Sequence, residues 1–388
     1  MDRRWIVLAA VFLARTSMGY QFQSIGSVGP FLISELAIDL AVLGSLIGAY
    51  KLPGLFLAIP SGMLGQRFGE KSLLVLGMLL MAVGGVMSAR SGSVDVMYVG
   101  RILSGVGAVA FNVLSSKMIA DWFAERELTV AMSIHVNSWP FGIALGLATQ
   151  AAFAEAYSLS GMLMMSALFC GAGVLLLLFG ASNRQVPAPG GSASLKFGLG
   201  GREFLLVSTA AMIWMLFNAN LIVVVSFAPA YLVSQGYEAI AAGQLASTGI
   251  WIGVVAVPLG GLIVQKWING DLFMVAMFLG GAAATMSLIF LDDRLIAFIA
   301  IGLLAWSPAG AIIAVPVQIL SPANRAMGMG IFFSYYYLGI GILPSVAGYL
   351  GDVTGDPAAP ILFATALLLL ALCSLITLRL LQRRTLVT

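Results

Sequence analysis

Three positively charged residues lie inside long apolar stretches of this sequence: Arg15, Lys51 and Arg101. None of the 16 Asp and Glu residues falls in the middle of such a stretch. A cation at the centre of a membrane costs about 2.5 to 3.5 kcal/mol on insertion scales, so cations kept there usually have a function. Without acidic neighbours they can attract an anion. The sequence therefore predicts a positively charged site that accepts a small anion.

The composition places these residues in a membrane. Hydrophobic residues make up 60% of the 388-residue chain and charged residues 9%, far from the average of a soluble protein. Apolar runs of about 20 residues, long enough for a helix to cross the hydrocarbon core, recur from end to end. They do not alternate as the strands of a β-barrel do. We predict an all-α membrane protein with twelve transmembrane helices, at 5–28, 40–62, 72–89, 94–119, 128–153, 161–180, 204–232, 239–264, 272–291, 295–320, 327–350 and 359–381.

Loop charges predict the orientation. With the N-terminus inside, most of the 19 basic residues fall on the cytoplasmic side and only Arg90 and Arg294 lie outside, as the positive-inside rule requires. The first span follows Arg3 and Arg4 and lacks a small-residue cleavage site, so it is not a signal peptide. We expect an integral protein of a bacterial-type inner membrane with both termini in the cytoplasm.

A polar segment at 181–203 divides the chain, and its Pro187, Pro189 and Gly190 are typical of a flexible linker. We predict an N-terminal six-helix bundle at 1–180, a cytoplasmic linker at 181–203 and a C-terminal six-helix bundle at 204–388. The ends of the second and eighth spans also resemble each other, since Pro60, Gly62, Leu64, Gln66 and Arg67 match Pro258, Gly260, Leu262, Gln265 and Lys266. Duplicated halves with a site between them are typical of secondary transporters.

The loop between the second and third spans reads GMLGQRFGEK over residues 62–71 and resembles the signature loop of the major facilitator superfamily. In the fourth span, Arg101, Gly105 and Gly107 are similar to the arginine motif of the same superfamily. The resemblance covers the whole chain. It implies two pseudo-symmetric six-helix bundles that move a solute by alternating access, with a gating role for Gly62, Gln66, Arg67, Gly69 and Lys71.

The loop departs from the family pattern at two positions. Gln66 stands where the family usually carries an Asp, and Glu70 where it carries a basic residue. In the family that Asp belongs to a charge relay that holds the inward gate closed, so the relay differs here, and Glu70 is a candidate substitute. The alternative is a tight turn that needs only Gly62 and Gly69.

A second resemblance is narrower. The fifth span lacks the glycine-asparagine signature of nitrate porters, whereas 121–127, 214–218 and 226–229 resemble the cyanate-permease-like and anion-symporter branches. This similarity implies a small organic anion, such as a monocarboxylate, as the substrate.

The superfamily lines its central cavity with the first and fourth helices, so the resemblance makes Arg15 and Arg101 candidates for substrate contact. Helical spacing places Asn112 on the same face as Arg101. A guanidinium offers a planar fork to a carboxylate, whereas Lys51 is a point charge. From the second half we expect Asn218 and Tyr337 to complete the hydrogen bonds to the anion.

Each candidate has a structural alternative. Arg101 can bond backbone carbonyls of a neighbouring helix, and Lys51 can cap carbonyls freed by Pro53. Polar residues such as Asn218 can instead join packed helices. His135, the only histidine, is a candidate for proton coupling, but a lone histidine more often bonds a neighbouring helix.

Other function classes are less compatible with the sequence. Without a carboxylate in mid-span, transporters that carry protons on a buried Asp or Glu are disfavoured. The sequence has no phosphate-binding loop and no cluster of His and Cys, so we expect no enzyme activity, no cofactor, no metal and no nucleic-acid partner. We expect a monomer in contact with lipid that takes a small anion, with or without a coupling proton. Two alternatives stay open: an exporter of amphipathic or hydrophobic compounds, for which Pro140, Gly142 and Gly146 resemble an antiporter motif, and a non-transporting sensor.

Overall fold

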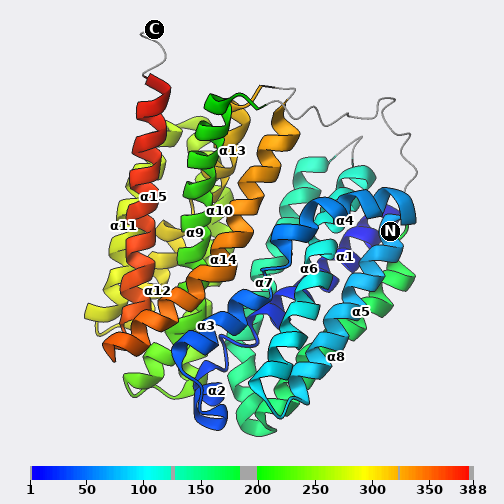
Figure 1. Cartoon of the computed structure of the whole chain (residues 1–388), viewed down its shortest axis with the longest axis vertical. Coiled ribbons are helices and arrows are strands. Elements are labelled where there is room, and N and C mark those ends of the chain that lie inside the picture. The colour runs from blue at the N-terminus through cyan, green and yellow to red at the C-terminus, as the bar shows by residue number, and fades with distance from the viewer. Residues whose placement is uncertain (1, 124–126, 184–198, 322–323, 384–388) are drawn as a thin grey trace.

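The computed structural model describes residues 2–123, 127–183, 199–321 and 324–383. All regular structure within these ranges is helical. Eleven helices are long and apolar enough to cross a membrane when two broken ones are counted as single spans, and the 21-residue α1 (Arg3–Gln23) adds the first of twelve. The predicted all-α architecture is therefore confirmed (Figure 1).

Helices α1 to α8 form the N-terminal half and α9 to α15 the C-terminal half (Figure 1). After α1, the N-terminal half contains α2 (Gly29–Leu36), α3 (Leu40–Ala49), α4 (Gly54–Phe68), α5 (Glu70–Ala89), α6 (Val94–Phe123), α7 (Leu128–Ala156) and α8 (Leu159–Gly180). The C-terminal half contains α9 (Gly201–Ser234), α10 (Ala239–Lys266), α11 (Gly270–Phe290), α12 (Arg294–Ala300), the π-helical turn η1 (Ile301–Ala305), α13 (Ala309–Ile319), α14 (Arg325–Thr354) and α15 (Ala359–Arg383). Much of the predicted linker lies outside the described residues, so its bounds stay a prediction.

Two spans that the sequence analysis treats as continuous are broken in the middle. The second span divides into α3 and α4 at residues 50–53, where Pro53 has no N–H group to continue the helix. The tenth divides at residues 306–308, before Pro308. There the Ser307 hydroxyl donates to the Leu304 carbonyl at 3.4 Å, the carbonyl that Pro308 leaves without its helical donor. The first span is also shorter than predicted, because α1 ends at Gln23.

The two halves meet at the far end of the molecule, away from the linker end where α8 stops and α9 begins (Figure 1). There α3 packs directly on α14. A methyl group at Gly44 would lie 2.1 Å from the carbonyl oxygen of Pro344, and one at Gly48 would lie 2.0 Å from that of Gly341. Only glycine permits so close a contact between two backbones. The Gln23 amide also crosses between the halves, donating to the Val225 carbonyl at 3.0 Å.

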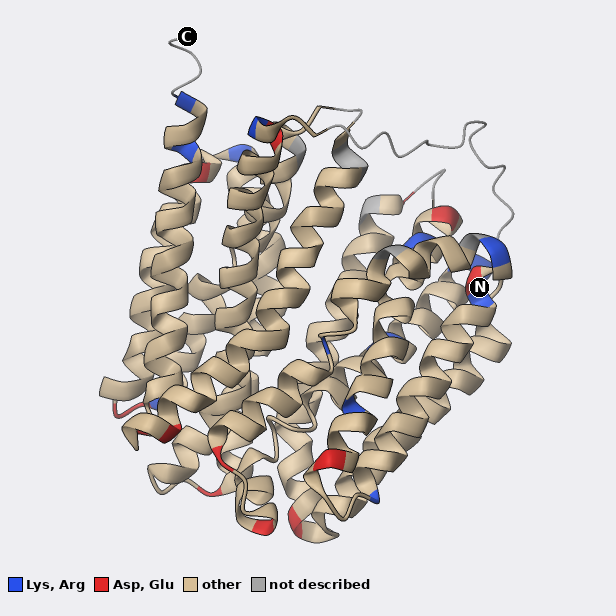
Figure 2. Cartoon of the chain, viewed as in Figure 1, with Lys and Arg blue, Asp and Glu red and all other residues tan. Residues whose placement is uncertain are grey.

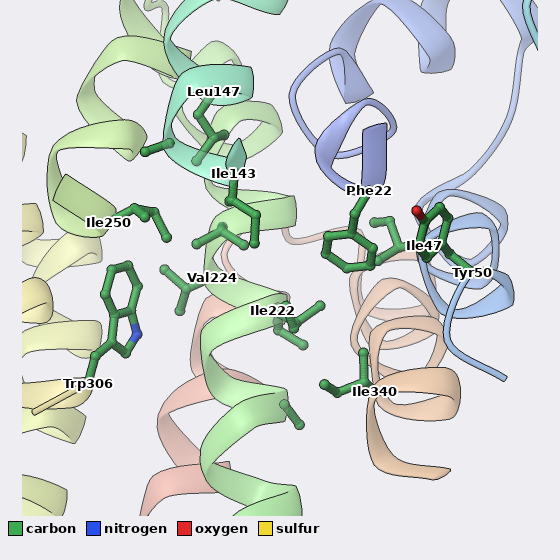
Figure 3. Close-up of a cluster of buried hydrophobic side chains, with 14 of the residues drawn as sticks. Phe22, Ile47, Tyr50, Ile143, Leu147, Ile222, Val224, Ile250, Trp306 and Ile340 are labelled. Atoms are coloured by element: carbon green, nitrogen blue, oxygen red, sulfur yellow. The ribbon is translucent and has the colours of Figure 1, made fainter. Parts of the chain in front are cut away.

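An apolar cluster seals the halves together between this contact and the centre. Figure 3 shows buried side chains from both halves in one cluster: Phe22, Ile47, Tyr50, Ile143 and Leu147 from the N-terminal half, and Ile222, Val224, Ile250, Trp306 and Ile340 from the C-terminal half. All of them are less than 5% exposed. Close packing of this kind excludes water. The far end is therefore closed.

Charge is distributed unevenly between the two ends. Figure 2 shows Lys and Arg gathered at the linker end and Asp and Glu at the far end, with a few exceptions on each side. By their positions in or next to the helix ends at this side, the far-end carboxylates include Glu35, Asp39, Asp95, Glu155, Glu238, Asp292, Asp293, Asp352 and Asp356. This asymmetry gives the molecule two chemically different ends.

Candidate functional site

Arg15 lies in the middle of α1 and reaches across to α6 and α7. Its Nη1 donates to the carbonyl oxygens of His135 at 2.7 Å and Val136 at 3.0 Å, and its Nη2 donates to Asn112 Oδ1 at 2.8 Å. The Val136 carbonyl needs such a donor because Pro140, four residues later in α7, has no N–H group. Arg15 therefore satisfies the α7 carbonyl that Pro140 frees, and all of its hydrogen-bond partners among the described residues are neutral.

Lys51 lies in the break between α3 and α4 and is 7% exposed. Its Nζ is 4.6 Å from the ring centroid of Trp139 and 5.0 Å from that of Phe22. Within the described part of the chain, Nζ has no hydrogen-bond partner, so the carbonyls near Pro53 are not capped by it. The ammonium is held by aromatic faces alone, and such contacts stabilise a cation by only about 0.5 to 2 kcal/mol.

Arg101 is 2% exposed and bonds to three backbone carbonyls. Its Nε donates to Leu46 at 3.1 Å, and its Nη1 and Nη2 donate to Gln21 and Phe22 at 3.0 Å each. These carbonyls lie in the last turns of α1 and α3, where carbonyls lack partners within the helix. The Gln21 carbonyl also accepts from the N–H and the hydroxyl of Ser24. The contacts agree with the structural alternative for Arg101, and the predicted substrate contact stays a prediction.

Asn112 and Tyr337 line one cavity of about 390 Å³ between the two halves, on the linker side of the closed region. Its walls come from α4 and α6 on one side and from α14 on the other. The Oδ1 of Asn112 accepts from Arg15, which leaves its Nδ2 as a donor. The Tyr337 ring packs on Gly54, where a methyl group would lie 2.1 Å from the ring. The cavity therefore leads to the Arg15 network.

The site is rich in donors and poor in acceptors. Among the described residues, the buried nitrogen atoms that lack a hydrogen-bond partner include Nε of Arg15 and the indole Nε1 atoms of Trp139 and Trp214. Lys51 lies within electrostatic range of both Arg15 and Arg101. None of the three cations forms an ion pair with a described carboxylate. Buried donors are normally satisfied, so this arrangement can hold an added acceptor that carries negative charge.

Asn218 lies in α9 and forms a hydrogen bond within that helix, and its predicted contact with the substrate stays a prediction. Its Nδ2 donates to the carbonyl of Trp214, one turn earlier in the same helix, at 2.8 Å. Trp214 stacks on Phe217, Phe332 and Tyr336, with ring centroids 5.6 to 6.2 Å apart. Tyr336 in turn lies within electrostatic range of Arg15. This aromatic stack is the main element that the sequence analysis missed, although its members lie at helical spacing within α9 and α14.

His135 is fully buried between α7 and α6. Its Nε2 lies 3.2 Å from Ser116 Oγ and 3.5 Å from Ser115 Oγ. Its Nδ1 has no partner within the described part of the chain. These contacts are those of a histidine bonded to a neighbouring helix, and proton coupling through His135 stays a prediction.

The signature loop is a tight turn at Gly69, whose φ of 82° favours glycine. Gly62 lies inside α4 instead, so it is not part of the turn. A methyl group added there would lie 3.9 Å from the Val113 side chain, so the position does not require glycine. Lys71 Nζ donates to the Leu178 carbonyl at 2.7 Å, and the guanidinium of Arg67 lies 5.4 Å from the centre of the Phe68 ring. The side chain of Gln66 lies outside the described structure.

Glu70, the unusual residue of this loop, forms a salt bridge with Lys117 of α6. Lys117 also contacts Asp121, one turn later in α6, at 2.7 Å. These contacts join helices of the N-terminal half at the linker end. The predicted gating role of the loop stays untested.

The chain was compared with curated proteins, with solved structures and with models of protein families. No match to a curated protein was found. Solved structures with the same fold include the nucleoside transporter NupG (15% identity, 97% of this chain and 98% of that chain, TM-score 0.76). They also include a bacterial homolog of the human lysosomal transporter Spinster (17% identity, 99% and 97%, TM-score 0.75) and the xylose transporter XylE from E. coli in an inward-open conformation (16% identity, 96% and 95%, TM-score 0.77).

At these identities the neighbours show the fold alone, and they leave the predicted cyanate-permease-like branch unconfirmed. Family membership comes from the sequence. The model of the Major Facilitator Superfamily matches residues 10–318, which is most of the chain. The match includes the signature loop, the α6 arginine and the candidate-site residues of the N-terminal half and α9, and it ends before α14. The chain therefore belongs to the Major Facilitator Superfamily.

Proposed function

We propose that this membrane protein transports a small organic anion by alternating access, and that the anion binds at Arg15, Lys51, Asn112 and Tyr337. The fold is that of a secondary transporter. One observation supports the anion proposal most directly. The positive charge at the centre is not neutralised, because the buried cations and donors there have no described carboxylate partner. An anion entering the site gains hydrogen bonds and cancels charge at the same time.

The conformation supports the proposed mechanism. The far end is sealed by the apolar cluster and by backbone contacts, whereas the cavity lies on the linker side of that seal. Basic residues gather at the linker end (Figure 2), which by the positive-inside rule faces the cytoplasm. We therefore propose an inner-membrane protein, with both termini in the cytoplasm, in a state that is closed to the outside and open to the inside.

The test is ligand binding by the purified protein in detergent. We would measure the shift in melting temperature produced by small carboxylates, cyanate and nitrate beside a panel of hydrophobic cations, because a ligand that binds only the folded state raises stability. Transport would be measured by uptake of each hit into proteoliposomes. We expect at least one carboxylate to stabilise the protein and to be taken up.

Two variants make this test specific. Arg15→Gln removes a central charge, and Arg90→Gln removes an exposed charge at the end of α5 as the matched control. We expect the anion response to be lost in the first and kept in the second. Full transport of the anion by a folded Arg15→Gln variant would contradict the proposed site.

The second candidate is an exporter of hydrophobic compounds, and the apolar walls of the cavity favour it. These walls include Phe56, Val113 and Phe333. Uncompensated cations in the centre disfavour a cationic cargo, since like charges repel at short range. Stabilisation by hydrophobic cations and by no anion would make the exporter the correct assignment.

A further inference from the structure

The cavity has a single polar end. Four of its lining side chains carry polar groups: Asn112, Ser116, Ser334 and Tyr337. The two serine hydroxyls donate within their own helices, Ser116 to the Asn112 carbonyl and Ser334 to the Gly330 carbonyl, each at 3.0 Å. Ser116 Oγ also lies 3.2 Å from His135 Nε2. Asn112 and Tyr337 remain as polar groups, close to each other and next to the Arg15 network. A ligand in this cavity therefore meets strong donors at one end only, which suits one carboxylate rather than two.

The remaining walls are apolar and aromatic. They are formed by Leu55, Phe56, Ala58, Val113, Met329 and Phe333 together with Gly330. Phe333 packs edge-on against both Phe332 and Tyr336, at interplanar angles of 86°. Those two rings belong to the aromatic stack that also contains Trp214 and Phe217. The C-terminal wall of the cavity is thus backed by several packed rings, which keep it rigid.

Edge-to-face and offset contacts between rings are favourable beyond the burial of apolar area. A ring entering the cavity finds Phe333 and Tyr337 from α14 and Phe56 from α4. Phe56 is 74% exposed, so its ring is available for such a contact. The wall chemistry favours an aromatic body over a purely polar one.

The volume points the same way. A cavity of about 390 Å³ falls in the range of sites for organic ligands, roughly 300 to 1,000 Å³. One water molecule takes about 30 Å³ of liquid, so an anion of two or three heavy atoms would leave most of the cavity to water. A ring that carries one carboxylate would displace that water from the apolar walls.

We propose that the transported substrate is an aromatic monocarboxylate, bound with its carboxylate toward Arg15, Asn112 and Lys51 and its ring against Phe333 and Tyr337. This inference rests on the proposed function, since it specifies the anion that the same site takes. In this proposal the N-terminal half recognises the charge of the substrate, and α14 of the C-terminal half recognises its ring.

A matched series of compounds tests it. The purified protein would be titrated with benzoate, cyclohexanecarboxylate, acetate, benzamide and benzylamine, with melting temperature and competition against radiolabelled benzoate as readouts. Benzoate and cyclohexanecarboxylate share charge and size, whereas benzoate and benzamide share the ring but not the charge. We expect benzoate to bind at least tenfold more tightly than any other member of the series.

The outcomes separate the two proposals. Acetate or cyclohexanecarboxylate binding as tightly as benzoate would overturn the aromatic assignment and leave the anion transporter standing. Benzamide or benzylamine binding as tightly as benzoate would overturn the anion transporter itself. Absence of any response to benzoate, while another carboxylate binds, would overturn the aromatic assignment alone.

Variants locate the ring. Phe333→Ala removes a ring from the cavity wall, and Phe290→Ala removes one that is 70% exposed at the end of α11. We expect Phe333→Ala to weaken the binding of benzoate about tenfold, because the ring of benzoate loses apolar contact area with the wall. The binding of acetate should be unchanged. Phe290→Ala should change the binding of neither compound. Equal loss of benzoate and acetate in Phe333→Ala would mean general damage to the site and would contradict the assignment, as would unchanged benzoate binding.

Discussion

The carboxylate of Asp352 in α14 bonds to the backbone of Leu40 at the start of α3. Its Oδ1 accepts from the Leu40 N–H at 3.0 Å and its Oδ2 from the Ala41 N–H at 2.7 Å. Asp39 satisfies the N–H of Val42 from within the same half. A carboxylate at a helix N-terminus is favoured by the unpaired N–H groups and the helix dipole. Because Asp352 comes from the other half, opening the far end must break both bonds.

Asp352→Ala should therefore shift the protein toward a state open at the far end. Each bond to a charged group contributes about 1.5 to 3 kcal/mol, enough to change the populations of two states that differ by a few kcal/mol. The measurement is the distance distribution between spin labels at Glu155 and Asp292, one on each half, by pulsed electron resonance. The control is Asp293→Ala, which removes a carboxylate that caps α12 within one half. An unchanged distribution would show that Asp352 does not hold the closed state.

Gly348→Ala should act on the same contact through sterics. A methyl group there would lie 1.9 Å from the carbonyl oxygen of Leu40, so α3 and α14 would have to separate. Overpacking of this kind costs about 1 to 3 kcal/mol. Gly261→Ala is the control, since nothing lies within 4 Å of that site in α10. We expect the spin-label distances to lengthen only in Gly348→Ala.

Arg101→Gln should lower stability whether or not a ligand is bound. It leaves the carbonyls of Leu46, Gln21 and Phe22 without their charged donor in a site that water does not reach. The expected loss is at least about 3 kcal/mol. Thermal unfolding in detergent measures it. A variant as stable as the natural protein, but unable to bind the anion, would return Arg101 to the list of substrate ligands.

Lys51→Met should keep the stability of the protein and lose anion binding, in contrast to Arg101→Gln. Lys51 makes no hydrogen bond to the described residues, and its burial between Phe22 and Trp139 costs solvation of the charge. Replacing it with a flexible apolar side chain should leave the melting temperature of the empty protein equal or higher and remove the response to anions. A drop as large as that of Arg101→Gln would show that Lys51 has a structural role.

Arg15 and Pro140 should be energetically coupled. The Arg15 guanidinium bonds the Val136 carbonyl that Pro140 leaves without a helical donor. In the Pro140→Ala background the residue at 140 supplies its own N–H, so Arg15→Gln should destabilise the protein less than it does alone. A double-mutant cycle should give about 0.5 to 3 kcal/mol of coupling. Additive effects on thermal unfolding would show that Arg15 does not stabilise α7 at Pro140.

The fold could be predicted from the sequence because each span is a continuous apolar run with polar ends, and membrane spans of this kind can only be helices. The breaks near Pro53 and Pro308 were harder to place. A proline in a membrane helix is tolerated when another donor satisfies the freed carbonyl, as Ser307 does for Leu304. Whether that donor exists depends on local geometry that a hydropathy pattern does not contain.

The candidate site could be predicted only in part. The buried cations stand out in the sequence because charges are rare in spans, but Arg15 and Arg101 look alike there. They differ in their partners: Arg101 bonds only backbone carbonyls at helix ends, whereas Arg15 bonds Asn112 at the cavity. The aromatic stack around Trp214 could not be predicted from the sequence, because its residue types do not stand out. Aromatic residues are common in membrane helices, and only the packing of α9 on α14 brings these rings together.

Arg15, Lys51 and Arg101 all belong to one half of the molecule, and this has an electrical consequence. Under the proposed alternating access, they would face the cytoplasm and the outside in turn as a single block of positive charge. A charge that crosses the whole membrane field gains or loses about 2.3 kcal/mol per 100 mV. In the proposed orientation, with the linker end in the cytoplasm and the interior negative, the membrane voltage would favour the empty carrier in the state seen here. The proposed anion would cancel one unit of that charge, so the voltage would act most strongly on the return of the unloaded protein.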